Sequence, residues 1–256
     1  MAPPHPVIQL PYKHLGGYRV VAANQQELQS VILQRMALRK VTALVYANAN
    51  MVVQCAPWHE RFDDPRVIVA NDGVAMDLAA RWLCGGRFPS NLNGTDFTPY
   101  MLEHCGRPMR LFLYGARPAS IEGAARALQA MGHEVVGQLD GYTVLPEGEL
   151  IARLRAAEPD IVLVALGNPR QERWIIDHLD ELPPAVYTAV GAYFDFLSGL
   201  APRAPRLVRM LRLEWAFRLS LEPRRLLRRY TVGGYEFFRQ CWRERHSSAR
   251  NARATA

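Results

Sequence analysis

Four predicted strands of this chain end in polar or glycine-rich turns that could bind a ligand. The turns cover residues 46–50, 71–73, 114–116 and 167–171. Because ligands of open α/β sheets bind at the carboxyl ends of the strands, these turns predict a single crevice. A turn that leads into a helix presents free backbone N–H groups to phosphate oxygens. We therefore expect Gly115 and Gly167 to let a diphosphate approach the backbone closely.

Neither glycine turn carries a complete nucleotide-binding fingerprint. The chain lacks both G-x-G-x-x-G and G-x-x-x-x-G-K-[ST] at these positions. Those spacings serve the close approach of a dinucleotide or a nucleoside triphosphate to the backbone. Their absence argues against a dinucleotide-dependent dehydrogenase and against a P-loop kinase.

Three carboxylates near these turns have two interpretations each. Asp72 follows a predicted strand inside the crevice, where it is either a general base or a helix N-cap, a position that Asp favours. Asp96, in Asn93-Gly94-Thr95-Asp96, has the same two interpretations, and there we favour the cap. Asp195 follows the last predicted strand and is either a ligand contact or a buried hydrogen-bond acceptor.

The sequence offers no pattern that is typical of a metal site. It contains no Asp-x-Asp triplet, no H-x-x-x-H pair among its seven histidines and no C-x-x-C pair among its four cysteines. We therefore expect neither a metal nor another cofactor. Arginine side chains and helix N-termini would then have to neutralise a departing diphosphate. The scattered cysteines fit a reducing compartment.

Strands and helices are predicted to alternate along most of the chain. Apolar strands are predicted at 41–46, 67–70, 110–114, 134–136, 160–166 and 185–190. Helical periodicity covers residues 25–38, 74–83, 120–131, 150–157 and 171–179. This alternation indicates an α/β fold, with a parallel sheet that is covered on both faces.

Charge divides the chain into two predicted parts. The formal net charge is +7, yet residues 203–256 hold 14 Arg and 4 Glu, which leaves residues 1–202 slightly acidic. Pro202 and Pro205 mark the boundary. We predict an α/β core over 1–202 and a basic helical appendage over 203–256, interrupted at Pro223 and at Gly233-Gly234.

The basic appendage indicates an anionic partner, unless its charge is only the solvated face of exposed helices. No nucleic-acid-binding motif is present, so a membrane surface or a phosphorylated ligand is favoured over nucleic acid. The chain has no signal-peptide pattern at its start. Its apolar runs are far shorter than the about 20 residues that a membrane-spanning helix needs.

Arginines of the appendage are predicted to bind the membrane or an acceptor. Arg203, Arg206, Arg209 and Arg212 recur every third residue, which on one helix spreads them over about half the circumference. Apolar side chains between them, such as Leu207 and Trp215, suit a helix in a headgroup layer. The predicted acceptor and membrane residues are Arg203, Arg206, Arg209, Arg212, Arg218, Arg224, Arg225, Arg228 and Arg229.

Three sequence blocks together resemble the WecG/TagA/CpsF glycosyltransferase family. They are Asn71-Asp72-Gly73 with residues 92–96, then residues 159–174, and then residues 191–196 with motifs that continue to Tyr230. The resemblance implies a Rossmann-like core with a basic appendage. It also implies an inverting, metal-independent transfer from a UDP-sugar to a polyprenyl-diphosphate-linked sugar, by an enzyme bound peripherally to the cytoplasmic face of a bacterial membrane.

The same resemblance assigns roles to residues. It makes Asp72 the catalytic base and places Asn48 in a turn that the family uses for substrate, with Gln171 and Glu172 on the nucleotide side. The expected substrate-binding residues are Tyr46, Asn48, Asn71, Gly73, Asn93, Gly94, Asp96, Gly115, Gly167, Asn168, Pro169, Gln171, Glu172, Gly191 and Asp195.

Two departures from the family pattern bear on the donor sugar. Teichoic-acid members have Thr where this chain has Tyr46, and often Arg where it has Asn91. We therefore favour UDP-glucose, as in the exopolysaccharide members, over the alternative UDP-N-acetylmannosamine. Two rival functions are a basic nucleic-acid-binding protein and a non-catalytic UDP-sugar scaffold. The sequence is also compatible with a homo-oligomer.

Overall fold

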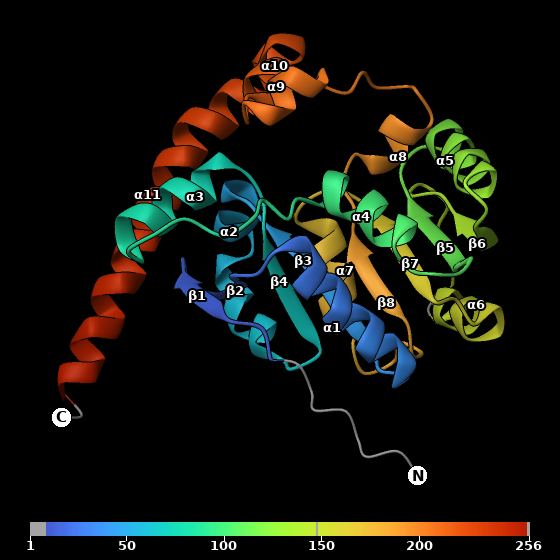
Figure 1. Ribbon diagram of the computed structural model, residues 1–256, viewed down its shortest axis with the longest axis horizontal. Coiled ribbons are helices and arrows are strands. Elements are labelled where there is room, and N and C mark those ends of the chain that lie inside the picture. The colour runs from blue at the N-terminus through green and yellow to red at the C-terminus, as the bar shows by residue number, and fades with distance from the viewer. Residues whose placement is uncertain (1–8, 147, 255–256) are drawn as a thin grey trace.

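A computed structural model describes residues 9–146 and 148–254, and it shows one eight-stranded sheet (Figure 1). The strand order is β1-β2-β4-β3-β8-β7-β5-β6. Only the edge pair β1–β2 is antiparallel, and every other neighbouring pair is parallel. The strands are β1 (Tyr12–Leu15), β2 (Tyr18–Val21), β3 (Thr42–Ala47), β4 (Val67–Asn71), β5 (Arg110–Gly115), β6 (Glu134–Leu139), β7 (Ile161–Ala165) and β8 (Val186–Ala189). The predicted α/β fold is confirmed.

Helices cover both faces of the sheet and enclose two apolar cores. One face carries α1 (Gln25–Ala37), α4 (Gly94–Glu103), α5 (Pro118–Ala130) and α8 (Tyr193–Leu197). The other carries α2 (Ala49–Gln54), the 3₁₀ helix η1 (Ala56–Asp63), α3 (Val74–Leu83), α6 (Glu149–Ala157) and α7 (Arg170–Asp177). Because both faces are covered, central strands such as β7 are buried at every residue, which is why they read as continuous apolar runs.

The sequence analysis missed several short elements. The hairpin of β1 and β2 adds four residues per strand at the sheet edge, and charged side chains interrupt both strands. The helices α2, α4 and α8 were also not predicted. Helices α2 and α8 have six and five residues, too few for a periodic pattern to be recognised, and α4 carries Pro99 inside it, a residue that argues against a helix.

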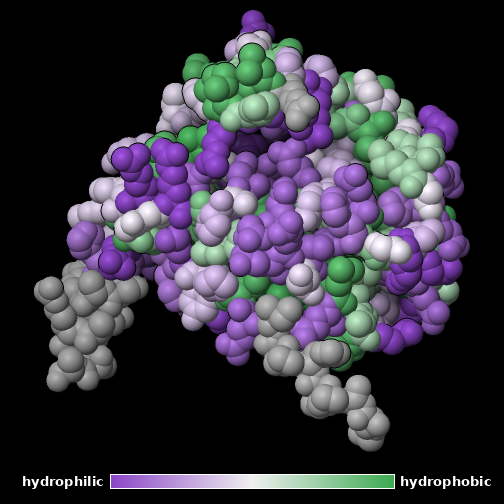
Figure 2. Space-filling model, in the orientation of Figure 1, coloured by the Kyte–Doolittle hydropathy of each residue, from purple (hydrophilic) through white to green (hydrophobic). Residues whose placement is uncertain are grey.

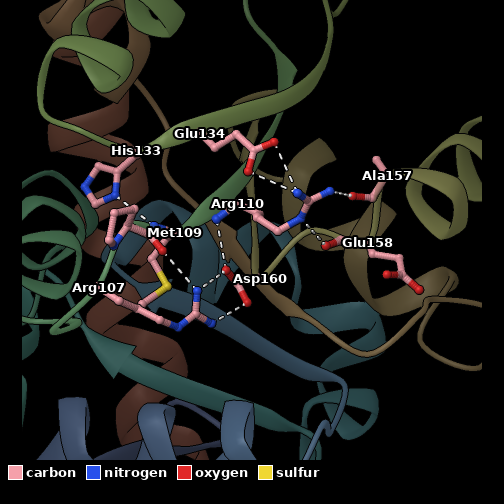
Figure 3. A network of polar contacts seen from close by, with 9 residues as sticks. Arg107, Met109, Arg110, His133, Glu134, Ala157, Glu158 and Asp160 are labelled. Atoms are coloured by element: carbon pink, nitrogen blue, oxygen red, sulfur yellow. Dashed lines mark hydrogen bonds and ion pairs between the residues drawn. The ribbon is translucent and has the colours of Figure 1, made fainter.

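The amino-terminal edge of the sheet is held by a network of ion pairs (Figure 3). Arg107 binds both carboxylate oxygens of Asp160, at 2.9 and 2.7 Å. The backbone N–H of Arg110 donates to the same carboxylate at 2.9 Å, and its guanidinium pairs with Glu134 at 3.0 Å. These residues stand at the starts of β5, β6 and β7, so this charged cluster is structural and lies opposite the strand ends predicted to bind a ligand.

The C-terminal segment forms three helices, which are α9 (Arg206–Met210), α10 (Glu214–Leu221) and α11 (Pro223–Ala254). The prediction that four arginines share one helix is wrong. Arg203 precedes α9, and Arg212 lies after it with a left-handed φ of 59°. Arg203 and Arg212 turn back to carboxylates of the core instead, which draws the chain out of a single helix. The Gly233-Gly234 pair does not interrupt α11.

Helix α11 packs against the side of the α/β core along α2 and α3 (Figure 1). Phe237 and Cys241 are buried in the same apolar core as α2 and α3. The Gln240 side chain donates to the carbonyl of Gly16 at 2.9 Å. The basic segment therefore completes one of the two cores. Among the described residues, no helix combines the length and the apolar character needed to cross a bilayer.

Candidate functional site

The side chains of Asn48 and Asp72 meet at the carboxyl ends of β3 and β4. The backbone N–H of Asp72 donates to the carbonyl of Ala47 at 2.8 Å, which continues the pairing of the two strands. The Asn48 amide donates to a carboxylate oxygen of Asp72 at 3.0 Å, while its own oxygen caps α2 through the N–H of Met51. Asn48 thereby fixes the orientation of Asp72 relative to the sheet.

Asp72 is not a helix cap. The N-cap of α3 is Gly73, and no side chain caps that helix. The half-buried carboxylate lacks water on most sides, and this burial raises its pKa. The hydrogen bond from Asn48 and the positive charges of Arg218 and Arg229 act in the opposite direction. A carboxylate with a raised pKa in a crevice suits general-base chemistry.

The N-terminus of α4 stands next to this pair. Asn93 is the N-cap, because its side-chain oxygen accepts the N–H of Asp96 at 2.9 Å. The cap interpretation of Asp96 is therefore wrong. Gly94 packs on the ring of Tyr46, where a Cβ atom would come within 2.9 Å of two ring carbons. Tyr46 itself is buried, and its hydroxyl contacts that of Thr188 at 3.2 Å, so this ring supports α4 from below.

Asp96 serves as an anchor for the C-terminal segment. Its carboxylate binds the guanidinium groups of Arg203 and Arg209, the latter at 3.1 Å. Arg212 pairs in the same way with Asp77, a carboxylate buried in α3. These three ion pairs hold the segment around α9 over the ends of β3 and β4.

Gln171 joins the turns that follow β7 and β8. Its side-chain oxygen accepts the backbone N–H groups of Gly167 at 3.1 Å and of Gly191 at 3.3 Å. The N–H of Ala116, beside Gly115, likewise donates to the carbonyl of Ala165. The prediction that these turns offer free N–H groups to a diphosphate is therefore wrong at Gly167 and at Ala116, because the Gln171 side chain and the Ala165 carbonyl already accept those groups.

Glu172 lies beneath the same turns and is fully buried. One carboxylate oxygen accepts the side-chain amides of Gln171, at 2.8 Å, and of Asn168. The other oxygen is buried without a hydrogen-bond partner. Burial raises the pKa of Glu172 to about 7, although both amides and Arg229 favour the charged form. This residue supports the turns from inside the protein.

The other predicted substrate residues differ in their surroundings. Asn71 is fully buried at the end of β4, and neither polar atom of its side chain has a hydrogen-bond partner. Pro169 precedes α7 after a cis peptide bond. Asp195, on α8, is half-buried and accepts a hydrogen bond from Ser120 of α5 at 2.6 Å, which ties two helices together, and its contact with a ligand stays a prediction.

The predicted arginines whose side chains the structure describes divide into three groups. Arg203, Arg209 and Arg212 bind core carboxylates, as described above. Arg218 of α10 and Arg229 of α11 lie close enough to Asp72 to stabilise its charge. Arg224 and Arg228 are exposed on α11. The predictions for Arg206 and Arg225 concern side chains outside the described part of the structure.

Two further residues belong to this site: Asn91, which the sequence linked only to the choice of donor sugar, and Glu214, which was not predicted. Asn91 accepts the backbone N–H of Gly73 at 2.9 Å and so holds the turn that carries Asp72. Glu214 of α10 is half-buried. Its pKa is raised by burial and by Asp96 and Asp72, and lowered by Arg203 and Arg218. Glu214 falls among the family motifs that continue to Tyr230, and this was the one signal for it in the sequence.

Metal-binding residues do not gather near Asp72. In residues 9–146 and 148–254, no three His, Cys, Asp or Glu side chains are grouped so that they could hold an ion. The metal-independent chemistry expected from the sequence stays a prediction.

Comparison with known families places this site in context. The model of the "Glycosyl transferase WecG/TagA/CpsF family" matches residues 13–251, which is nearly all of the chain. The chain belongs to this family. The match includes the ends of β3 and β4, the Gln171 turn and most of α11. The earlier resemblance, which rested on three sequence blocks, is thereby confirmed.

Two curated relatives come from bacilli. The Bacillus subtilis (strain 168) protein is 34% identical over 168 residues, and that of Bacillus spizizenii (strain ATCC 23059 / NRRL B-14472 / W23) is 32% identical over 167. Each alignment spans 64% of this chain and 64% of the relative, less than two thirds of either. Both relatives are named N-acetylglucosaminyldiphosphoundecaprenol N-acetyl-beta-D-mannosaminyltransferase.

Proposed function

We propose that this protein transfers a sugar from a UDP-sugar to a sugar linked to a polyprenyl diphosphate. The observation that carries the proposal is the Asn48–Asp72 pair at the strand ends, where the charges of Arg218 and Arg229 act on the Asp72 carboxylate. A general base beside cationic groups is what a displacement with a departing diphosphate needs. Family membership supports the same reaction class.

The donor sugar we now favour is N-acetylmannosamine. The relatives' names favour this alternative over the glucose inferred from Tyr46 and Asn91. Neither departure in sequence requires glucose. Tyr46 is buried under α4, and Asn91 binds the backbone of Gly73, so both residues shape the crevice from behind. The relatives' names likewise favour N-acetylglucosamine on undecaprenyl diphosphate as the acceptor.

The reaction we propose is a single displacement. The acceptor hydroxyl attacks the anomeric carbon from the face opposite UDP, and Asp72 takes the hydroxyl proton while the bond to UDP breaks. Arg218 and Arg229 stabilise the negative charge that develops on the diphosphate. In this proposal the two arginines take the role that the sequence had suggested for backbone N–H groups of the glycine turns. The N–H groups of Gly167 and Ala116 already donate hydrogen bonds within the protein.

The proposed place of action is the cytoplasmic face of a bacterial membrane. Helices α9 and α10 and the turn between them expose Leu207, Met210, Leu211 and Trp215. Exposed apolar side chains next to arginines are typical of segments that lie in a headgroup layer. Nucleic-acid binding is disfavoured because the basic segment carries no recognised nucleic-acid-binding motif.

A donor panel tests this function. The full-length protein is incubated with a short-chain polyprenyl-diphosphate N-acetylglucosamine and with either UDP-N-acetylmannosamine or UDP-glucose. We expect UDP release and a disaccharide product, detected by mass spectrometry, with the N-acetylmannosamine donor. Transfer from UDP-glucose alone would reverse the donor assignment. UDP-sugar binding without UDP release would make the protein a scaffold and contradict the proposed function.

A further inference from the structure

The groove between α4 and α9 has no role in the reaction described so far. Its walls include Gln25, Asn91, Tyr100, Arg203, Arg209 and Met210. We propose that this groove binds the sugar and diphosphate of the lipid-linked acceptor, an inference that rests on the proposed function. Its volume of 820 Å³ falls within the range of about 300–1,000 Å³ that is usual for small-molecule sites.

One end of the groove is lined by Asn91, the residue that also holds the catalytic turn. Asn91 lines the groove and accepts the N–H of Gly73, the residue that follows Asp72. The next residue, Leu92, donates its N–H to the carbonyl of Asn71. Asn91 therefore joins the groove to the turn that carries Asp72, and we place the reacting hydroxyl of the acceptor at this end, where it would extend past Asn91 to reach that carboxylate.

The other end of the groove opens at an apolar surface. Met210 lines the groove and is 69% exposed, and its neighbours Leu207 and Leu211 are 66% and 60% exposed. Figure 2 shows hydrophobic side chains gathered at the top of the molecule, over a hollow lined by hydrophilic ones. An acceptor with a polar head and a polyprenyl tail matches this arrangement. A UDP-sugar has no apolar end to match it.

Charge within the groove suits a diphosphate. Arg203 and Arg209 share the single carboxylate of Asp96, so their combined charge exceeds that of their partner. Glu103 also lines the groove, but it is the last residue of α4, whereas Asp96 lies in the first turn. The negative charge of Glu103 is therefore at the other end of the helix from the two arginines. The cationic part of the groove is therefore the part under α9, nearest the apolar surface.

Tyr100 and Gln25 form the wall proposed to contact the sugar. Tyr100 is half-buried on α4, and Gln25 begins α1. An aromatic ring beside an amide can pack against the C–H face of a pyranose and bind its hydroxyl or acetamide groups. Neither residue takes part in the bonds that hold Asp72, so both can be changed without altering the catalytic turn.

The test uses the full-length variant Gln25→Ala/Tyr100→Leu. Leucine keeps an apolar side chain against the core, and Gln25→Ala alone serves as a milder second variant. We expect the KM for the short-chain acceptor to rise about tenfold, the factor expected for one or two lost contacts. The KM for the UDP-sugar donor and kcat should stay within about twofold. Tyr12→Leu, on the exposed edge strand β1, is the matched control.

The possible outcomes separate the two proposals. An unchanged acceptor KM, or an equal rise in the acceptor and donor KM values, overturns the assignment of the groove. A rise in the donor KM alone assigns the groove to the UDP-sugar and also overturns it. Absence of transfer by the parent protein would instead mean that the proposed function is wrong. Thermal unfolding and UDP binding by calorimetry identify any variant that has lost its fold.

Discussion

Asp72 and Asp96 have the same side chain and lie close to each other, yet their surroundings differ. Asp96 is neutralised by two arginines from the C-terminal segment. Asp72 has one amide hydrogen bond and two arginines that act at longer range. The first carboxylate is therefore committed to holding the structure together, whereas the second can accept a proton.

Replacement of the proposed base should affect turnover more than binding. Asp72→Asn keeps the shape and the contact with Asn48 but cannot take a proton, so kcat should fall by about 10²–10⁴-fold. UDP binding, measured by calorimetry, should stay near that of the parent. Because burial raises the pKa of Asp72, activity of the parent should decline on acidification at a higher pH than an ordinary Asp would give. A variant that keeps a third of the parent's kcat would exclude Asp72 as the base.

Protonation of Glu172 should make stability depend on pH. Its pKa is about 7 in the folded protein and about 4.3 in an unfolded chain. The unfolded state therefore ionises first, and the free energy of unfolding should fall as pH rises from about 4.5 to about 7.

The variant Glu172→Gln removes this ionisation. The free energy of unfolding of the variant minus that of the parent should be larger at pH 8 than at pH 5, by up to about 3 kcal/mol. Urea denaturation at the two pH values measures the difference, and ionisations shared by both proteins cancel. A difference that does not change with pH would show that Glu172 is already ionised near pH 5.

At the scale of elements, the strand-end turns form a connected layer. Gln171 binds the turns after β7 and β8, and the turn after β5 lies directly on β7. A Cβ atom at Gly115 would come within 2.6 Å of the backbone carbon and oxygen of Ala165, and its φ is 109°. The crevice thus depends on backbones that approach each other closely.

Substitution of Gly115 should therefore lower the free energy of unfolding by more than backbone strain at a positive φ would alone. Gly115→Ala should lower the free energy of unfolding by about 3 kcal/mol or more, since left-handed strain and a backbone clash add. Gly132→Ala is the matched control, because Gly132 has a φ of 90° but open space around its Cα. It should cost about 1 kcal/mol. Equal losses in chemical denaturation would show that the contact with Ala165 has no effect.

At the scale of the whole molecule, the basic C-terminal segment is joined to the core at several points. Three arginines bind core carboxylates around α9, and Phe237 of α11 is buried in the core. Deletion of residues 203–256 would therefore expose apolar core surface. Substitutions on the outer face of α9 test the proposed membrane contact without this complication.

Membrane binding should depend on the exposed apolar side chains of α9 and the residue that follows it. Leu207→Ser/Leu211→Ser should weaken sedimentation with anionic vesicles at least about tenfold, because each buried leucine contributes about 1.5–3 kcal/mol. Leu38→Ser/Met131→Ser changes two similarly exposed residues elsewhere and should bind like the parent. Equal binding by both double variants would mean that this apolar surface does not contact the bilayer.

The sequence alone determined the α/β fold and the strand ends that carry Asn48, Asp72 and Gly167. These features follow from local patterns, because buried parallel strands are continuous apolar runs and turns need polar residues or glycine. The family resemblance also rested on short contiguous blocks. Local patterns could not show which polar groups already had partners.

Only the tertiary structure decided which polar groups of the site are engaged. Asn93 caps α4 in place of Asp96, and the carboxylate of Asp96 instead pairs with Arg203, more than a hundred residues later in the chain. The N–H of Gly167 lost its predicted role because the Gln171 side chain accepts it, and the same oxygen accepts the N–H of Gly191 from the turn after β8. The groove beside Asn91 exists because α9 folds back over α4. Hydrogen bonds and ion pairs between distant segments depend on how those segments pack, and no spacing within either segment records that packing.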